Sequence, residues 1–361
     1  MKLFKRILIL TAIALILENG ALYYLNKNYF KPTEEINIVK IESPKIAETD
    51  NSNKTTLSGK TEKINASFDG NYISYMEDST LKIMNLSTKE IQNVVPNDDM
   101  KFDYYEWLPD DNRLIITERP SNMSNSYSIY LFSYDVKKKS KQQLIDFDNV
   151  YCHIALDNIE EHVSNISFSS SNTYMCVQIA KPNGKSNLYS FDVMSKKNIM
   201  KENASVTGNI DVIPGDTAIV YQADNSVYQI ESFTDKNETT KYNGSYLSIN
   251  GANSLLLLDV DDKSNIYIGS VVNGLVTSVY YGQKNTDANS WTLINLSKPV
   301  KAEDISIGLK GEIYVIDSQA NTVNELNSKA TYEFKGKLIS ICSKGIISLD
   351  GNTLIDKPFS K

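Results

Sequence analysis

The stretch FDGNYISYMEDSTLKIMNLSTKEI, from Phe68 to Ile91, contains the pattern that decides the fold of this chain. An aromatic residue precedes a turn of Asp, Gly and Asn. A short apolar run follows, then a second turn and a second run in which apolar and polar residues alternate. Alternation over about 4–8 residues between turn residues is typical of β-strands. The stretch therefore predicts strands of a small antiparallel sheet.

The same pattern recurs along the rest of the chain. Each copy starts with an aromatic or aliphatic residue before a turn rich in Asp, Gly, Asn or Ser. The copies start at Phe68, Trp107, Phe168, Ile213, Ile249, Ile307 and Ile341. Successive starts lie 34–61 residues apart, and propeller blades of four strands repeat at about 40–50 residues. We predict an all-β fold, a β-propeller of four-stranded blades, with seven blades favoured over six or eight.

Two features of the repeat are irregular. Two intervals are long, and we expect loop insertions near residues 146–164 and 282–300, or a degenerate blade hidden in each. The last copy has room for about three strands. Residues about 55–66 are expected to supply the missing strand, because closing the ring with both chain ends removes exposed sheet edges.

The turn of the repeat resembles the F-SPDG turn between the first two strands of WD40/TolB-like propeller blades. Phe68–Gly70 and Trp107–Asp111 match it most closely, and the resemblance covers roughly residues 60–357. The N-terminal propellers of DPP-IV-type proteins share this turn but precede a hydrolase domain, and we expect no such domain here. The resemblance implies an architecture and does not by itself imply an activity.

The N-terminus predicts a membrane anchor. Residues 1–6 form a basic tail, and residues 7–25, ILILTAIALILENGALYYL, are mostly apolar. Nineteen helical residues reach about 28 Å, close to the thickness of the hydrocarbon core of a bilayer. Basic residues before the span place the N-terminus inside the cell. Residues 26–57 are polar and predict a flexible linker, which leaves residues 58–361 for an extracytoplasmic propeller on a bacterial cytoplasmic membrane.

Two points about this segment stay open. Its purely apolar part is short enough for a cleaved signal peptide, which would make the protein secreted, although no A-x-A-like site follows. Glu18 lies within the predicted span. A carboxylate there is costly, so Glu18 either lies near the outer headgroups or pairs with a partner helix.

Chemistry-bearing residues gather mainly in the first insertion. His153, Asp157, Glu161 and His162 are the densest set of potential metal ligands. On a helix the first three would share a face and His162 would point away, so the set is a candidate rim site for a divalent cation. A solvated acidic turn is the simpler interpretation. No nucleophile elbow, phosphate-binding loop or CxxC spacing is present in the sequence, and we predict neither a catalytic set nor a cofactor.

The remaining candidates concern surfaces. Tyr104, Tyr105 and Trp107 could form an aromatic stacking surface, although alternating strand faces explain them as well. The net charge of −7 argues against nucleic acid as a partner. The three cysteines, Cys152, Cys176 and Cys342, suit small buried side chains, with one disulfide open if the protein is exported.

Together these observations predict a noncatalytic binding or scaffold protein of the bacterial cell envelope. Its propeller face and loops would bind a protein, a peptide or a wall polymer. The alternative is a propeller enzyme, a metal-assisted lyase or hydrolase, with a rim site in residues 150–163. The sequence does not identify the ligand, the process or the oligomeric state.

Overall fold

The computed structural model describes Glu18, Asn19, Tyr24 and most residues between 52 and 359. Within that range it leaves out 60, 123–126, 147, 148, 170–173, 193–196, 216, 217, 235–239 and 285. The chain divides into two compact units, residues 1–50 and 51–361. All named strands belong to the second unit.

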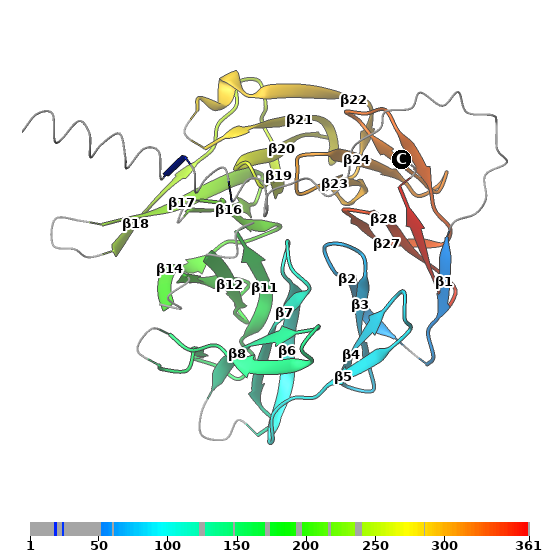
Figure 1. Ribbon diagram of the computed structural model, residues 1–361. Helices are drawn as coiled ribbons and strands as arrows, with labels where there is room; N and C mark the ends of the chain where they lie inside the picture. The colour runs from blue at the N-terminus through cyan, green and yellow to red at the C-terminus, as the bar shows by residue number, and fades with distance from the viewer. Residues whose placement is uncertain are drawn as a thin grey trace, which may run out of the picture. The chain divides into compact units, whose positions relative to one another are not determined.

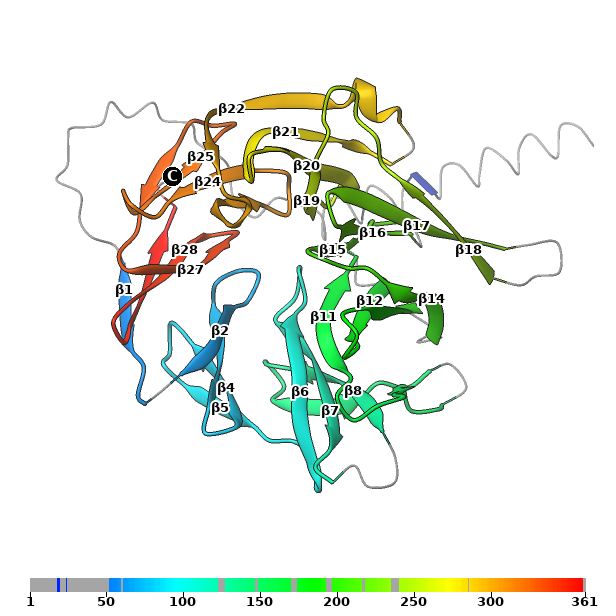
Figure 2. The same cartoon turned by 180° about the vertical axis from the view of Figure 1, so that it is seen from behind.

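The second unit is a ring of seven antiparallel sheets around a central axis (Figure 1, Figure 2). This confirms the predicted propeller and its seven blades. The first three blades are β2 (Glu62–Ala66), β3 (Tyr72–Glu77), β4 (Thr80–Asn85) and β5 (Ile91–Val94); β6 (Met100–Trp107), β7 (Arg113–Pro120), β8 (Ser128–Asp135), β9 (Ser140–Gln143) and β10 (His153–Ala155); and β11 (His162–Phe168), β12 (Tyr174–Ala180), β13 (Ser186–Asp192) and β14 (Lys197–Ala204).

The next three blades continue in chain order. They are β15 (Ile210–Val212), β16 (Ala218–Ala223), β17 (Ser226–Thr234) and β18 (Thr240–Tyr246); β19 (Leu255–Val260), β20 (Asn265–Val272), β21 (Leu275–Gln283) and β22 (Thr292–Val300); and β23 (Ile305–Ile307), β24 (Ile313–Asp317), β25 (Thr322–Glu325) and β26 (Thr331–Glu333). Two short 3₁₀ helices, η1 (Ala288–Ser290) and η2 (Ala302–Asp304), flank β22.

The seventh blade joins the two ends of the propeller. It consists of β27 (Lys337–Cys342), β28 (Gly345–Asp350), β29 (Thr353–Pro358) and β1 (Asn53–Thr56). β1 pairs antiparallel with β29, with Asn53 opposite Asp356 and Thr56 opposite Thr353. Closure by an N-terminal strand is thus confirmed. Only residues 53–56 supply this strand, since β2 already belongs to the first blade.

The two long intervals of the repeat have different origins. Residues 144–161 are a true insertion, because β9 and β10 both pair with β8, at opposite ends of its outer edge. The prediction of a second insertion near residues 282–300 was wrong. LLLL of the copy at Ile249 lies in β19, the inner strand of its blade, rather than after the turn. The equivalent turn follows Val260, and residues 292–300 form the ordinary outer strand β22.

Apolar side chains fill the junctions between blades. Each junction between neighbouring blades holds a cluster of buried side chains among the described residues. The cluster between the last and first blades includes Leu57, Tyr75, Cys342 and Leu354. Trp107 of the second blade is buried and donates its indole N–H to the Ser74 hydroxyl of the first, at 2.9 Å. Burial therefore stabilises each blade against its neighbours rather than within itself.

Polar contacts of the first blade's turn reinforce the junctions on both of its sides. Asp69 accepts hydrogen bonds from the Ser67 hydroxyl and the Asn71 amide within its own turn, both at 3.0 Å. It also accepts from Asn112 of the second blade at 3.2 Å and lies 3.5 Å from the ammonium of Lys344 in the seventh. Burial by itself raises the pKa of Asp69, but these donors together lower it below its usual value. Asp69 thus connects three blades.

We expect Leu57→Ala to lower the free energy of unfolding by about 3 kcal/mol, because it removes a buried side chain that holds β1 in the closing blade. Urea denaturation of the parent and variant measures the difference. Val95→Ala is the matched control, since Val95 is 62% exposed. Equal, small effects of the two changes would contradict the closure.

We expect Asp69→Ala to cost about 2 kcal/mol near neutral pH, because buried donors lose their acceptor. Since the folded-state pKa of Asp69 is lowered, its stabilisation is present above the unfolded pKa and is lost as the pH falls through the folded value. The difference between parent and variant should therefore shrink in acid. Asp262→Ala, at an exposed position, is the control. An equal loss of free energy of unfolding in that variant would show that the contacts of Asp69 do not add to stability.

Candidate functional site

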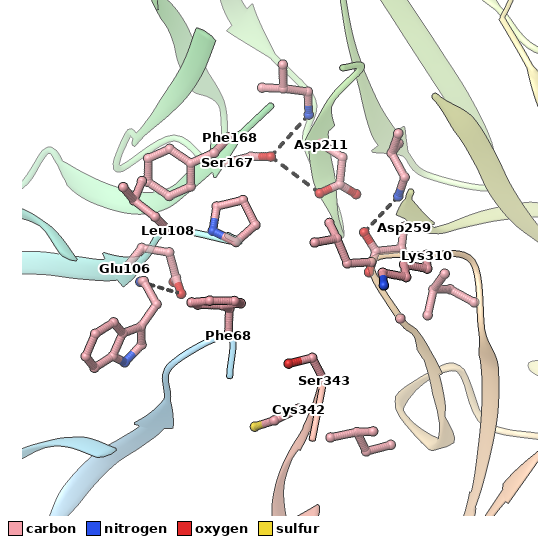
Figure 3. Close-up of a pocket in the computed structure, with 18 of the residues that line it drawn as sticks. Phe68, Glu106, Leu108, Ser167, Phe168, Asp211, Asp259, Lys310, Cys342 and Ser343 are labelled. Atoms are coloured by element: carbon pink, nitrogen blue, oxygen red, sulfur yellow. Dashed lines mark hydrogen bonds between the residues drawn. The ribbon is translucent and has the colours of Figure 1, made fainter. Parts of the chain in front are cut away.

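A cavity of about 650 Å³ lies on the propeller axis (Figure 3). It sits where the inner strands end and the turns of the repeat begin, and all seven blades contribute lining residues. Inner strands of successive blades run side by side around it, for example β6 with β11, β11 with β15, and β15 with β19. Side chains at equivalent positions of the repeat are therefore brought to one opening. A concave site with few convergent polar groups is the usual form of a ligand-binding pocket.

Four acidic residues line this cavity. Glu312, in the β23–β24 turn, accepts the amide of Lys310 at 3.2 Å, and the other three come from inner strands. Glu106 is near the end of β6, Asp211 is in β15 and Asp259 is in β19 (Figure 3). Asp211 accepts a hydrogen bond from the Ser167 hydroxyl at 3.4 Å. Asp259 accepts one from the amide of its neighbour Val260 at 2.7 Å.

Glu106 has two donors. The Tyr104 hydroxyl donates at 3.0 Å and the Trp107 amide at 3.2 Å. Among the ion pairs between described residues, none involves Glu106, Asp211 or Asp259. The three carboxylates are therefore only partly stabilised by the protein itself.

Burial shifts the protonation of this group. Desolvation raises the pKa of Asp211 to about 7, against the opposing hydrogen bond from Ser167. Desolvation, and then repulsion from Asp211, raises the pKa of Asp259 well above its usual value. Desolvation also raises the pKa of Glu106, against its hydrogen bonds. Near neutral pH the cavity therefore holds carboxyl groups that a positive charge would help to ionise.

Apolar and aromatic side chains form much of the remaining wall. Phe68, Leu108 and Phe168 line the opening around Glu106 (Figure 3). Lys310, an exposed residue of the β23–β24 turn, lines the side of Asp259 (Figure 3). Buried Cys342 lies in the wall at the end of β27, and burial raises the pKa of its thiol to about 11. All three cysteines are free thiols.

The four metal-ligand candidates of the sequence do not converge. The segment is a strand, a turn and a strand rather than a helix, so no common helical face exists. His153 and His162 are exposed. Asp157 is exposed and lies 3.8 Å from Lys181, whereas Glu161 is buried and accepts a hydrogen bond from the Asp157 amide at 2.8 Å. In the described part of the chain, no group of three His, Cys, Asp or Glu is placed to hold a metal ion.

The aromatic candidates lie in the core rather than on an exposed surface. Tyr105 and Trp107 are buried between the first and second blades. Tyr104 is half-buried and packs between the second and third. Alternation along β6 points these side chains into the two junctions on either side of the blade, and Trp107 also reaches the cavity wall.

Most of the N-terminal candidates lie outside the described residues. Of the predicted span, only Glu18, Asn19 and Tyr24 are described, and all three are helical and exposed. The span and any pairing of Glu18 therefore stay predictions. Of the predicted linker, residues 52–57 are described and contain β1. A search limited to the described residues finds no helix that is long and apolar enough to cross a membrane.

Sequence reasoning missed the cavity carboxylates, although the sequence contains a signal for two of them. In EWLP and DVIP, Glu106 and Asp211 stand three residues before the proline of the turn. Aligning the copies would place both at the end of an inner strand, facing the axis. Asp259 occupies the equivalent place before Val260. The sequence analysis started the fifth copy at Ile249, ahead of the true turn, so this signal was missed.

Comparisons with known proteins show the fold and leave the family open. No family model and no curated protein matches the chain. One chain from the crystal structure of a mitotic checkpoint complex aligns with a TM-score of 0.50 at 10% identity, covering 91% of this chain and 100% of that one.

Two further solved structures align less closely. Hsv2p from Kluyveromyces lactis has a TM-score of 0.48 at 12% identity and covers 80% and 89% of the two chains. A Bacteroides ovatus protein named as a candidate dipeptidyl aminopeptidase IV has a TM-score of 0.43 at 10% identity, covering 75% of this chain and 46% of that one.

We expect Asp211→Asn to stabilise the propeller more at pH 8 than at pH 5. The folded-state pKa of about 7 exceeds the ordinary 3.8, so the stability that this group contributes is present below about 4 and is lost as the pH rises to about 7. The melting temperature of the variant minus that of the parent should rise by about 2 °C or more between the two pH values. Exposed Asp98→Asn should show no such change, and a pH-independent difference for Asp211→Asn would contradict the expectation.

Proposed function

We propose that this chain is a noncatalytic binding protein that holds a protein or peptide partner at its axial cavity. The cavity carries the proposal, because it is the place where all seven blades contribute side chains to one concave surface. The propeller neighbour from a multiprotein complex agrees with a scaffold role. In this proposal the seven-bladed ring is the rigid support and the ring of turns is the contact surface.

The proposed location is the outer side of a bacterial cytoplasmic membrane. Residues 7–25 support an anchor by their length and apolar character, and the basic residues before them support an inside N-terminus. The partners would then be other envelope proteins. Fractionation of cells that express the full-length protein tests this point: we expect it in the membrane fraction, and full-length protein free in the medium would contradict anchoring.

In-cell cross-linking of the full-length chain tests the binding role. We expect one envelope protein to be recovered repeatedly with it, in near equal amounts. Ser343→Trp places a large side chain at the cavity wall and should reduce that recovery at least about tenfold, because a blocked pocket excludes the anchoring group of the partner.

Ser87→Trp is the matched control, because Ser87 is an exposed residue of the β4–β5 turn and does not line the cavity. Equal recovery with Ser343→Trp and Ser87→Trp would contradict the axial site. No reproducible protein in any sample would contradict a protein partner and favour a wall polymer.

A further inference from the structure

The half-buried carboxylates of Glu106, Asp211 and Asp259 differ in their partners from two other carboxylates of the propeller, both in the second blade. Asp103 is paired with Arg119 at 3.1 Å and also accepts the Val163 amide at 2.7 Å. Glu118 is fully buried and paired with the ammonium of Lys141. In the second blade both of these buried acids are thus paired with a cation. Buried Asp261 of the fifth blade has no cation partner and is held by four hydrogen-bond donors instead. A buried charge without such partners is costly.

The cavity places four acids on one opening without that compensation, and Glu312 of the sixth blade is one of them. Glu106, Asp211 and Asp259 come from three different blades, and no described Lys or Arg forms an ion pair with them. Asp211 has one hydrogen-bond donor, at 3.4 Å, and Asp259 has one, from its adjacent amide. Contacts within the propeller therefore satisfy Glu106, Asp211 and Asp259 only in part.

The spacing of these acids argues for an extended cation rather than a metal ion. Within the described residues they do not form a group of three that could hold one ion. β11 separates the strand of Glu106 from that of Asp211, whereas Asp211 and Asp259 are on the neighbouring strands β15 and β19 (Figure 3). A planar guanidinium with five N–H donors, or an ammonium with three, can satisfy carboxylates on separate strands.

The walls suit the rest of such a side chain. Phe68, Leu108 and Phe168 offer apolar surface beside the acids. Lysine and arginine bury their aliphatic stems along apolar surface while the charged head finds polar partners. An aromatic face near a cation adds attraction through the ring quadrupole. The volume of about 650 Å³ leaves room for one such side chain and part of the main chain that carries it.

We infer that the axial cavity recognises an arginine or lysine side chain of the partner, with its cationic group held by Asp211 and Asp259 and its stem against Phe68 and Phe168. This inference rests on the proposed binding function and specifies the ligand group that the same site takes. Glu106 extends the acidic side of the pocket toward the second blade. Lys310 lies on the rim and favours a carboxylate or a main-chain carbonyl next to the basic residue.

Titration of the full-length protein in detergent micelles with labelled pentapeptides tests the inference. The probes are peptides of sequence Gly-Ser-X-Ser-Gly, in which X is arginine, lysine, citrulline or norleucine. Their binding is measured by fluorescence anisotropy at pH 8. Citrulline has nearly the shape of arginine without its charge. We expect the arginine and lysine peptides to bind at least about tenfold more tightly than the citrulline and norleucine peptides.

Asp211→Asn combined with Asp259→Asn should remove this preference at pH 8 while the melting temperature stays at or above that of the parent, because both changes keep side-chain shape and remove charge. Glu106→Gln should weaken the preference for cationic peptides less than the double change does. Asp98→Asn combined with Asp350→Asn removes the same net charge from exposed positions outside the cavity. That control should bind as the parent does, which separates the pocket from general attraction to an acidic protein.

Three outcomes would overturn the inference: equal binding of the arginine and citrulline peptides, unchanged binding by the Asp211 and Asp259 double variant, or no binding of any peptide at millimolar concentration. If one of these occurs while Ser343→Trp still abolishes partner recovery in cells, the cavity binds a partner through other chemistry. If partner recovery is also insensitive to Ser343→Trp, the proposed function itself fails.

Discussion

The pairing of β1 with β29 is the interaction on which the rest of the propeller depends. A blade of four short strands has two apolar faces and no core of its own, so each blade needs a neighbour on both sides. Without β1 the seventh blade would present an open edge at β29, next to the junction that contains Leu57 and Leu354. Two segments about 300 residues apart along the chain therefore complete one sheet. The axial cavity follows from this closure, because the inner strands surround one axis only in a complete ring.

Two aspartates serve different purposes in this ring, buried Asp69 and half-buried Asp211. Asp69 is surrounded by donors from three blades, and its pKa is lowered despite burial. Asp211 receives one hydroxyl, and desolvation prevails and raises its pKa. At Asp69 the donors and the charge of Lys344 outweigh desolvation, whereas at Asp211 the single donor does not. We interpret the first arrangement as a contribution to stability, and the second as a local cost that a ligand can offset.

The second blade shows how the repeat tolerates change without loss of the ring. Its outer position is shared by β9 and β10, which pair with opposite ends of β8. The extra residues extend away from the axis, at the sheet edge where no neighbouring inner strand is displaced. Glu161 and Arg119 stabilise this region: Glu161 accepts the Asp157 amide, and Arg119 donates to the carbonyls of Ile159 and Glu161. Of the two histidines that suggested a metal site, His153 is therefore part of this insertion, whereas His162 begins β11 of the third blade.

The sequence by itself determined the class of fold, the blade repeat, the true insertion near residues 146–164 and the closure by an N-terminal strand. These follow from local properties, namely strand alternation and turn residues, which act over a few positions. The sequence could not determine the register of the fifth blade, because LLLLDV is apolar enough to fit either an inner strand or the strand that follows it. Only the tertiary structure decided that Tyr105 and Trp107 are buried, and that Glu106, Asp211 and Asp259 face one cavity. Their proximity depends on the closing of the ring, which brings residues about 50 to 150 positions apart to one axis, and no local pattern contains that distance.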